Sequence, residues 1–264
     1  MAKNNKFYNS VAGWPIDRRI QSARDCVRLL TDRIQSVIEL HAANEIIQYS
    51  SKLSGQISKS RAAHAFTVFQ DAQFNMEIIK LIALWDSPAE NSVSIPTVVI
   101  LIDDSEVLRA LVGETFDSHT SRDVHQLNPS NDPEIQKAIE EISWAQQVEF
   151  AKSQSEKAAE ALEACVTTVK ATMEKERVTS VRNLRDLVSH SVTMTRRESN
   201  GPVKPMKYGD EKKLLTISIR LVEDLYLWVN GTSFDISGDC VEIARKQAGE
   251  LWLNCEFSIP QTRQ

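Results

Sequence analysis

The chain has 264 residues, a formal net charge of −5 at pH 7 and a pI near 5.6. Eight glycines and eight prolines are few for this length, which favours long helices over a turn-rich all-β fold. The acidic balance excludes a generally basic protein that binds nucleic acid nonspecifically, but it allows a local basic patch.

The first third of the chain predicts two long amphipathic helices. Apolar residues recur at spacings of three and four from Ile16 to Val37, and the pattern continues weakly to about residue 58, with a candidate break at residues 50–56. A second helix fits residues 59–85, and the sequence WDSPAENS at residues 85–92 is a clear stop signal.

Residues 94–114 begin with a Ser94 that can cap a helix carrying Pro96 in its first turn. The β-branched run from Val98 to Ile102 also fits a buried strand, and the helical surroundings favour the helix. The polar residues 116–134 predict a loop. It holds His119 and His125 beside two aspartates, where a metal site is conceivable but a solvated loop is favoured, because nothing fixes the ligand geometry.

The second half predicts one very long helix, or two nearly collinear ones, from Asp132 to His190. Two prolines and two glycines break the pattern at residues 195–213. A helix over residues 214–230 is closed by Gly231, and a last helix covers residues 238–254. Five or six helices in an up-and-down arrangement predict an all-α bundle.

The spacing of the cysteines and the hydropathy of the chain indicate the cellular compartment in which we expect the protein. The four cysteines are widely spread, without a CxxC pair, which predicts reduced thiols rather than a disulfide framework or a zinc site. The longest apolar run, residues 95–102, is too short to span a membrane. We therefore expect a cytoplasmic protein without membrane contact, metal or cofactor.

The sequence RDLVSH at residues 185–190 is the strongest candidate for chemistry. On a helix, Asp186 and His190 share a face, so the carboxylate can fix the imidazole tautomer and leave one nitrogen free for proton transfer. Arg185 lies about 140° round an ideal helix from His190, but its long side chain can lean towards the same groove. A histidine base and an arginine suited to phosphate are what metal-free RNA cleavage requires.

An ordinary surface turn explains the same residues. In that interpretation Arg182 and Asp186 form a surface ion pair, and His190 interacts with the helix dipole. The spacing alone favours this interpretation, but the charge of the surrounding residues counts against it. Nine basic and four acidic residues lie between Arg177 and Lys213, so positive charge gathers around the motif in an otherwise acidic chain.

The arrangement Arg185-Asp186-x-x-x-His190 resembles the Rx4–6H signature of the HEPN superfamily, in which a polar residue often follows the arginine. Residues 74–104 are similar to a stretch of the abortive-infection U-type HEPN branch, where a helix ends in an aromatic-Asp pair before a "SIP" helix start. The resemblance covers about residues 15–235. It implies an N-terminal tail at 1–14, a HEPN-like domain at 15–235, and a C-terminal helix and tail at 236–264 packed on that domain.

The resemblance implies a homodimeric, metal-independent endoribonuclease that acts as a toxin or antiphage effector, with RNA as substrate and an antitoxin protein as a further partner. Arg185 would bind the scissile phosphate, His190 would be the general acid or base, and Asp186 would orient either one. Further RNA contacts are expected from the basic residues nearby: Arg182, Arg196, Arg197, Lys204 and Lys207. The alternatives are a non-catalytic HEPN module that binds nucleic acid or protein, and a purely structural bundle.

Overall fold

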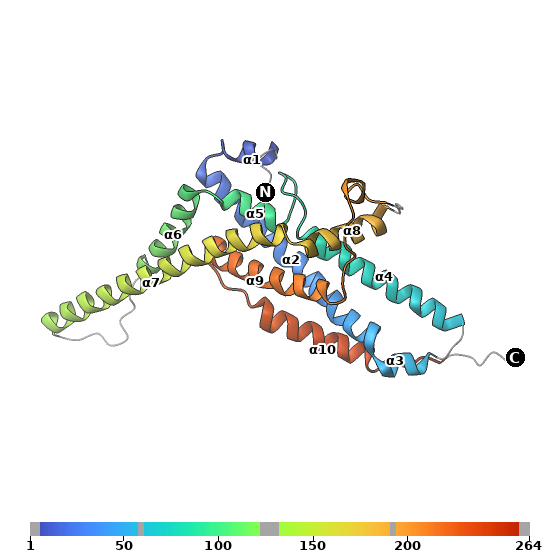
Figure 1. The fold of residues 1–264 in the computed structure, drawn as a ribbon. Coiled ribbons are helices and arrows are strands. Elements are labelled where there is room, and N and C mark those ends of the chain that lie inside the picture. The colour runs from blue at the N-terminus through green and yellow to red at the C-terminus, as the bar shows by residue number, and fades with distance from the viewer. Residues whose placement is uncertain (1–5, 58–60, 122–131, 191–193, 259–264) are drawn as a thin grey trace.

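A computed structural model describes residues 6–57, 61–121, 132–190 and 194–258. These residues form helices and no strands (Figure 1). The α-helices are α1 (Lys6–Val11), α2 (Ile16–Tyr49), α3 (Ser51–Gln56), α4 (Arg61–Ala83), α5 (Ile95–Ile102), α6 (Ser105–Thr120), α7 (Pro133–Met173), α8 (Glu176–His190), α9 (Asp210–Asn230) and α10 (Val241–Trp252). The predicted all-α bundle with one very long helix is confirmed, since α7 alone has 41 residues.

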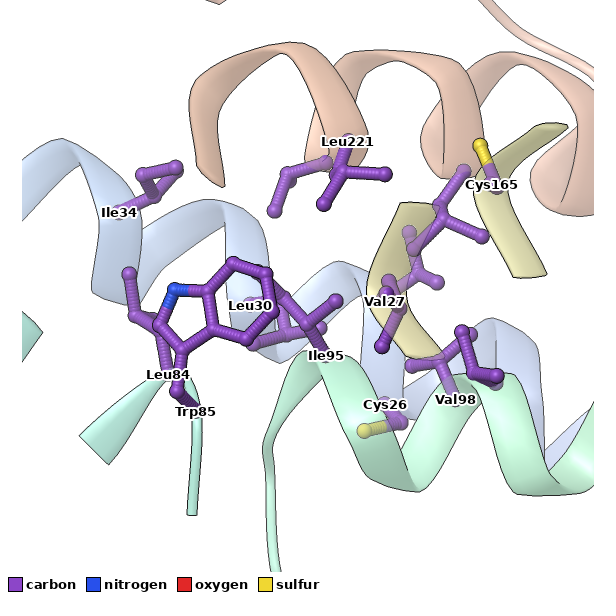
Figure 2. Packing of buried hydrophobic residues seen from close by; sticks show 14 of the residues in the cluster. Cys26, Val27, Leu30, Ile34, Leu84, Trp85, Ile95, Val98, Cys165 and Leu221 are labelled. Carbon is purple, nitrogen blue, oxygen red and sulfur yellow. The ribbon is translucent and has the colours of Figure 1, made fainter. Parts of the chain in front are cut away.

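Helix α2 is the centre of the bundle, and it packs against α4, α5, α9 and α10. Its buried face carries Val27, Leu30 and Ile34, which follow the predicted helical spacing. Trp85 and Leu221 close the same core from other segments (Figure 2). Burial of such a contiguous apolar cluster is the main term that stabilises the fold.

The apolar run at residues 95–102 is helix α5 and not a strand, as the helical surroundings predicted. The Ser94 side chain accepts a hydrogen bond from the Thr97 backbone N–H, and every residue of α5 is buried. Arg19 of α2, only 6% exposed, binds the C-terminal end of α5. Its Nε donates to the Leu101 carbonyl at 2.9 Å, and its Nη1 pairs with Asp104 at 3.0 Å.

The loop prediction for residues 116–134 is partly wrong, because α6 continues to Thr120. The last turn of α6 lies along α7 and is held there by two contacts. The Gln147 side chain donates to the His119 carbonyl at 2.6 Å, and the His119 ring meets Phe150 edge-on. His125 and Asp123, the other part of the conceivable metal site, lie outside the described residues.

The long pattern from Asp132 to His190 divides into α7 and α8 at Glu174–Lys175. The break lets Val178 and Val181 of α8 enter the core while α8 packs on α4. Helix α9 begins at Asp210, four residues before the sequence indicates, because Gly209 adopts a left-handed conformation (φ 79°) and starts the helix.

The two ends of the described chain also contribute to the core. Helix α1 buries Phe7 and Val11, and α10 places Ala244 and Ala248 against the bundle. All four cysteines are free thiols, and burial raises the pKa of Cys26 to about 11. Among the described helices, none combines the length and the hydropathy needed to cross a lipid bilayer.

Candidate functional site

Helix α8 carries the RDLVSH motif at its C-terminal end and is fixed by contacts with α4, α7 and α9. Val178 and Val181 are fully buried near its start, whereas His190 at its end is exposed. The helix therefore presents the motif at the margin of the bundle, with its N-terminal turns anchored in the core.

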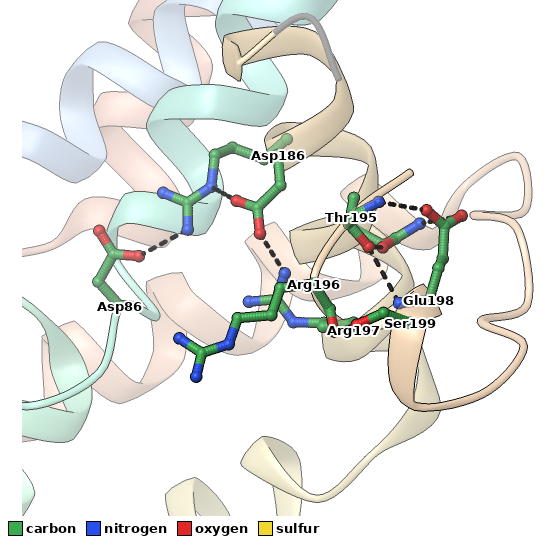
Figure 3. Close-up of polar contacts among 9 residues, drawn as sticks. Asp86, Asp186, Thr195, Arg196, Arg197, Glu198 and Ser199 are labelled. Atoms are coloured by element: carbon green, nitrogen blue, oxygen red, sulfur yellow. Dashed lines mark hydrogen bonds and ion pairs between the residues drawn. The ribbon is translucent and has the colours of Figure 1, made fainter. Parts of the chain in front are cut away.

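Arg185 lies between two carboxylates and is 23% exposed. Its Nη2 is 3.3 Å from an oxygen of Asp86, which follows the end of α4 (Figure 3). Its Nε is 2.7 Å from an oxygen of Asp186, although this ion pair lacks the alignment of a hydrogen bond.

Asp186 joins two arginines and does not contact His190. One carboxylate oxygen faces Arg185, and the other accepts a hydrogen bond from Arg197 (Figure 3). Of the partners that the sequence suggested for Asp186, namely His190, Arg185 and Arg182, the structure gives it Arg185. The carboxylate holds both guanidinium groups at the end of α8.

The segment that carries Arg197 is tied to α8 by a polar network. Asn183 of α8 donates to the Glu198 carboxylate at 3.1 Å, and the second Glu198 oxygen accepts the Thr195 backbone N–H at 2.6 Å (Figure 3). The Thr195 hydroxyl donates back to the Asn183 side chain. The Thr195 N–H and then Asn183 hold the pKa of Glu198 below its usual value, so the network persists with an ionised carboxylate.

Arg182 has a different environment from the other basic residues near the motif. It is half-buried and donates to the carbonyl oxygen of Trp85, instead of forming the ion pair with Asp186 that belongs to the surface-turn alternative. Burial, followed by the charge of Arg197, lowers its pKa. Its contacts indicate that Arg182 joins α8 to the end of α4.

His190 is the last residue of α8, and its side chain is exposed. Within the described ranges, its imidazole has no hydrogen-bond or ion-pair partner. One chain thus offers a fixed arginine and an accessible histidine at the same helix end, without direct contact between them.

Two of the basic residues expected to contact RNA are paired with acids. Lys204 lies 2.9 Å from Glu176, and Arg197 pairs with Asp186. Arg196 and Lys207 are exposed. The positive charge counted along the sequence is therefore partly neutralised in space.

Sequence reasoning missed Asp86 as a member of this site. A signal for it was present, since Asp86 is the acid of the aromatic-Asp pair on which part of the family resemblance rests. In the described part of the chain, no three His, Cys, Asp or Glu side chains group in a way that could hold a metal ion.

Comparison with known proteins gave one family match. A family model described as AbiU2, a HEPN model, matches residues 20–238, which include the whole of α8 and the acid after α4. No curated protein and no solved structure matched the chain.

Proposed function

The chain belongs to the AbiU2 family of HEPN domains, and from this premise we propose that it is a metal-independent endoribonuclease of antiphage defence. The observation that supports the proposal most is the end of α8. There Arg185 is fixed by Asp86 and Asp186 while His190 stays accessible, all within the matched residues. As a defence effector the protein would act on cytoplasmic RNA as a toxin, with a protein antitoxin as a further partner.

The chemistry follows from these two side chains. His190 would take the proton from a ribose 2′-hydroxyl, and the 2′-oxygen would attack the adjacent phosphorus as the bond to the 5′-oxygen breaks. The guanidinium of Arg185 would stabilise the negative charge that develops on the phosphate oxygens. The products would be a 2′,3′-cyclic phosphate and a 5′-hydroxyl.

A second subunit would supply what one chain lacks. The reaction needs a base for the 2′-hydroxyl and an acid for the departing 5′-oxygen, and each chain offers one accessible histidine at this helix end. A homodimer that apposes two α8 ends would present two arginines and two histidines to one RNA strand. The site would then be complete only in the dimer.

The experiment that tests the proposal is RNA cleavage by the purified protein in EDTA, with the product ends identified. We expect 2′,3′-cyclic phosphate ends from protein that sediments as a dimer. A folded dimer that cleaves none of a varied set of RNAs, but binds one of them or a protein, would favour the non-catalytic HEPN module. The pairing of Lys204 and Arg197 with acids leaves less positive charge for RNA, and it favours the form of this second candidate that binds a protein.

Asp186→Asn is expected to lower RNA cleavage by roughly tenfold, less than the loss of Arg185 itself. The amide keeps the size of the side chain but loses the charge that attracts two guanidinium groups, so Arg185 becomes less well positioned. Single-turnover cleavage rates measure the effect, and far-ultraviolet circular dichroism checks the fold. Asp25→Asn is the matched control, since Asp25 is also a helical aspartate near an arginine, at 3.5 Å from Arg28. Equal rates for Asp186→Asn and the unchanged protein would remove Asp186 from the site.

A further inference from the structure

A cavity of about 510 Å³ lies beside α8, on the side of the chain where α2 and α4 meet the segment that leads into α9. A second hollow of about 400 Å³ adjoins it. The two share part of their walls, namely Gln48, Tyr49, Phe74, Tyr208 and Glu211. We therefore treat them as one cavity with two lobes, a wide lobe beside α8 and a narrow lobe beside His41.

The narrow lobe contains a buried carboxylate network. Glu77 is 1% exposed, and one of its oxygens is 2.7 Å from His41 Nδ1 while the other accepts a hydrogen bond from Asn44 at 2.7 Å. His41 Nε2 lies 3.6 Å from Glu45, which pairs with Lys212 at 2.6 Å. Within this network, His41 Nδ1 and one N–H of Asn44 face Glu77, and Lys212 is directed to Glu45.

Two acceptors at the cavity are buried without a partner. Glu211, 8% exposed, has its Oε2 atom shielded from solvent with no hydrogen bond to any described residue. Asn44, 3% exposed, has its Oδ1 in the same condition. The amide of Asn44 cannot simply be reversed, because its nitrogen donates to the Gln73 carbonyl and to Glu77. Buried acceptors without donors are costly, so both positions call for a ligand that donates.

The charge of the lining defines the ligand further. Five carboxylates line the two lobes, and Lys212 is the one Lys or Arg among the described lining residues: the acids are Glu45, Asp71, Glu77, Glu198 and Glu211. Such a lining repels phosphate and attracts cations. Burial, and the neighbouring charge of Glu77, raise the pKa of Glu211, so a cation at this carboxylate would offset both effects.

The rest of the wall suits an aliphatic chain. Leu184 and Leu187 of α8, Met206 and Phe74 line the wide lobe. Tyr49 and Tyr208 meet edge-to-face where the lobes join, with ring centroids 5.5 Å apart, and add aromatic surface that favours a cation. The methylene groups of such a chain would pack on the apolar wall, and ammonium groups at its two ends would pair with carboxylates.

We propose that this cavity binds an aliphatic polyamine, with one ammonium group donating to Glu211 Oε2 and Asn44 Oδ1 and a second directed to the acids of the wide lobe. This site is separate from Arg185 and His190 and goes beyond the proposed nuclease. Because α8 forms part of the cavity wall through Asn183, which also holds Glu198, an occupied cavity would stiffen the helix that carries the motif.

The test is isothermal titration of the full chain with spermidine at low and at physiological salt. We expect saturable binding of one spermidine per chain that persists at the higher salt. Glu211→Gln should weaken it by roughly 10- to 100-fold, because a neutral amide accepts without the charge that strengthens the hydrogen bond. The matched control is Glu242→Gln, since Glu242 is likewise the second residue of a helix but is exposed and away from the cavity.

Three outcomes decide the proposal. Loss of affinity in Glu211→Gln alone, with an unchanged melting temperature in the absence of spermidine, supports it. No saturable heat, or equal weakening in both variants, overturns it, the latter because it indicates diffuse attraction to an acidic protein. The readout is binding and not cleavage, so an inactive nuclease would leave this result unaffected.

Discussion

His190→Ala is expected to lower RNA cleavage by roughly 100- to 10,000-fold, the range for removing a positioned proton-transfer group. Arg185→Ala should lower it by roughly 100- to 1,000-fold, because the guanidinium meets charge that is greatest in the transition state. His190 is exposed at a helix end and Arg185 is one-quarter exposed, so neither substitution removes core packing. Folding should therefore be retained while activity is lost.

Matched controls separate these effects from a general loss of positive charge. His64 of α4 and Arg109 of α6 are also exposed helical residues, and their alanine variants should cleave at the unchanged rate. Equal losses in His64→Ala and His190→Ala would point to a nonspecific effect and would contradict the assignment of His190.

Heterodimers test whether the site is shared between subunits. Differently tagged unchanged and His190→Ala chains can be co-expressed and the mixed dimer purified on both tags. If two histidines serve one site, the mixed dimer should lose nearly all activity. Half of the activity of the unchanged dimer would instead show two independent sites.

Trp85→Ala is expected to reduce the free energy of unfolding by about 3–5 kcal/mol, as for other large-to-small changes in cores. Trp85 is fully buried at the end of α4 and packs between α2 and α9 (Figure 2). Its indole N–H donates to the Ser218 hydroxyl at 2.8 Å, and its backbone carbonyl accepts a hydrogen bond from Arg182. The substitution thus creates a cavity and removes a buried hydrogen bond together.

Chemical denaturation followed by circular dichroism measures this effect. Trp144→Ala is the matched control, because Trp144 on α7 is 53% exposed and its loss should change stability by less than about 0.5 kcal/mol. Trp85→Phe should fall between the two, since it keeps much of the packing and loses the hydrogen bond. A denaturation midpoint for Trp85→Ala close to that of Trp144→Ala would show that the core repacks to fill the space of the missing ring.

Periodicity alone predicts the helical class and most helix positions. The regular spacing along α2, the cap at Ser94 and the stop signal after Trp85 each act within a few residues, so they can be read directly from the sequence. The predictions are wrong where tertiary contacts determine the secondary structure. The last turn of α6 is polar and reads as a loop, and its packing against Phe150 of α7 keeps it helical.

The candidate site shows the same division. The RDLVSH spacing locates Arg185, Asp186 and His190 on one helix end, but it does not reveal that Asp186 contacts Arg197 instead of His190. The ion pair between Arg185 and Asp86 joins residues distant in sequence, beyond the reach of helical spacing. The carboxylate cavity likewise collects residues from α2, α4 and α9, and no local pattern indicates it.

The start of helix α7 is a place where insertions and deletions would leave the core intact. Residues 133–146 include no buried side chain, whereas Ala151, Ala158 and Leu162 are buried further along. The helix is unbroken between these two parts (Figure 1). Each residue removed from the exposed stretch would shorten the projection by about 1.5 Å and rotate its tip by about 100°. The packing of the buried part of α7 in the bundle would stay unchanged. The length and direction of this projection can therefore change without altering the packing of the core.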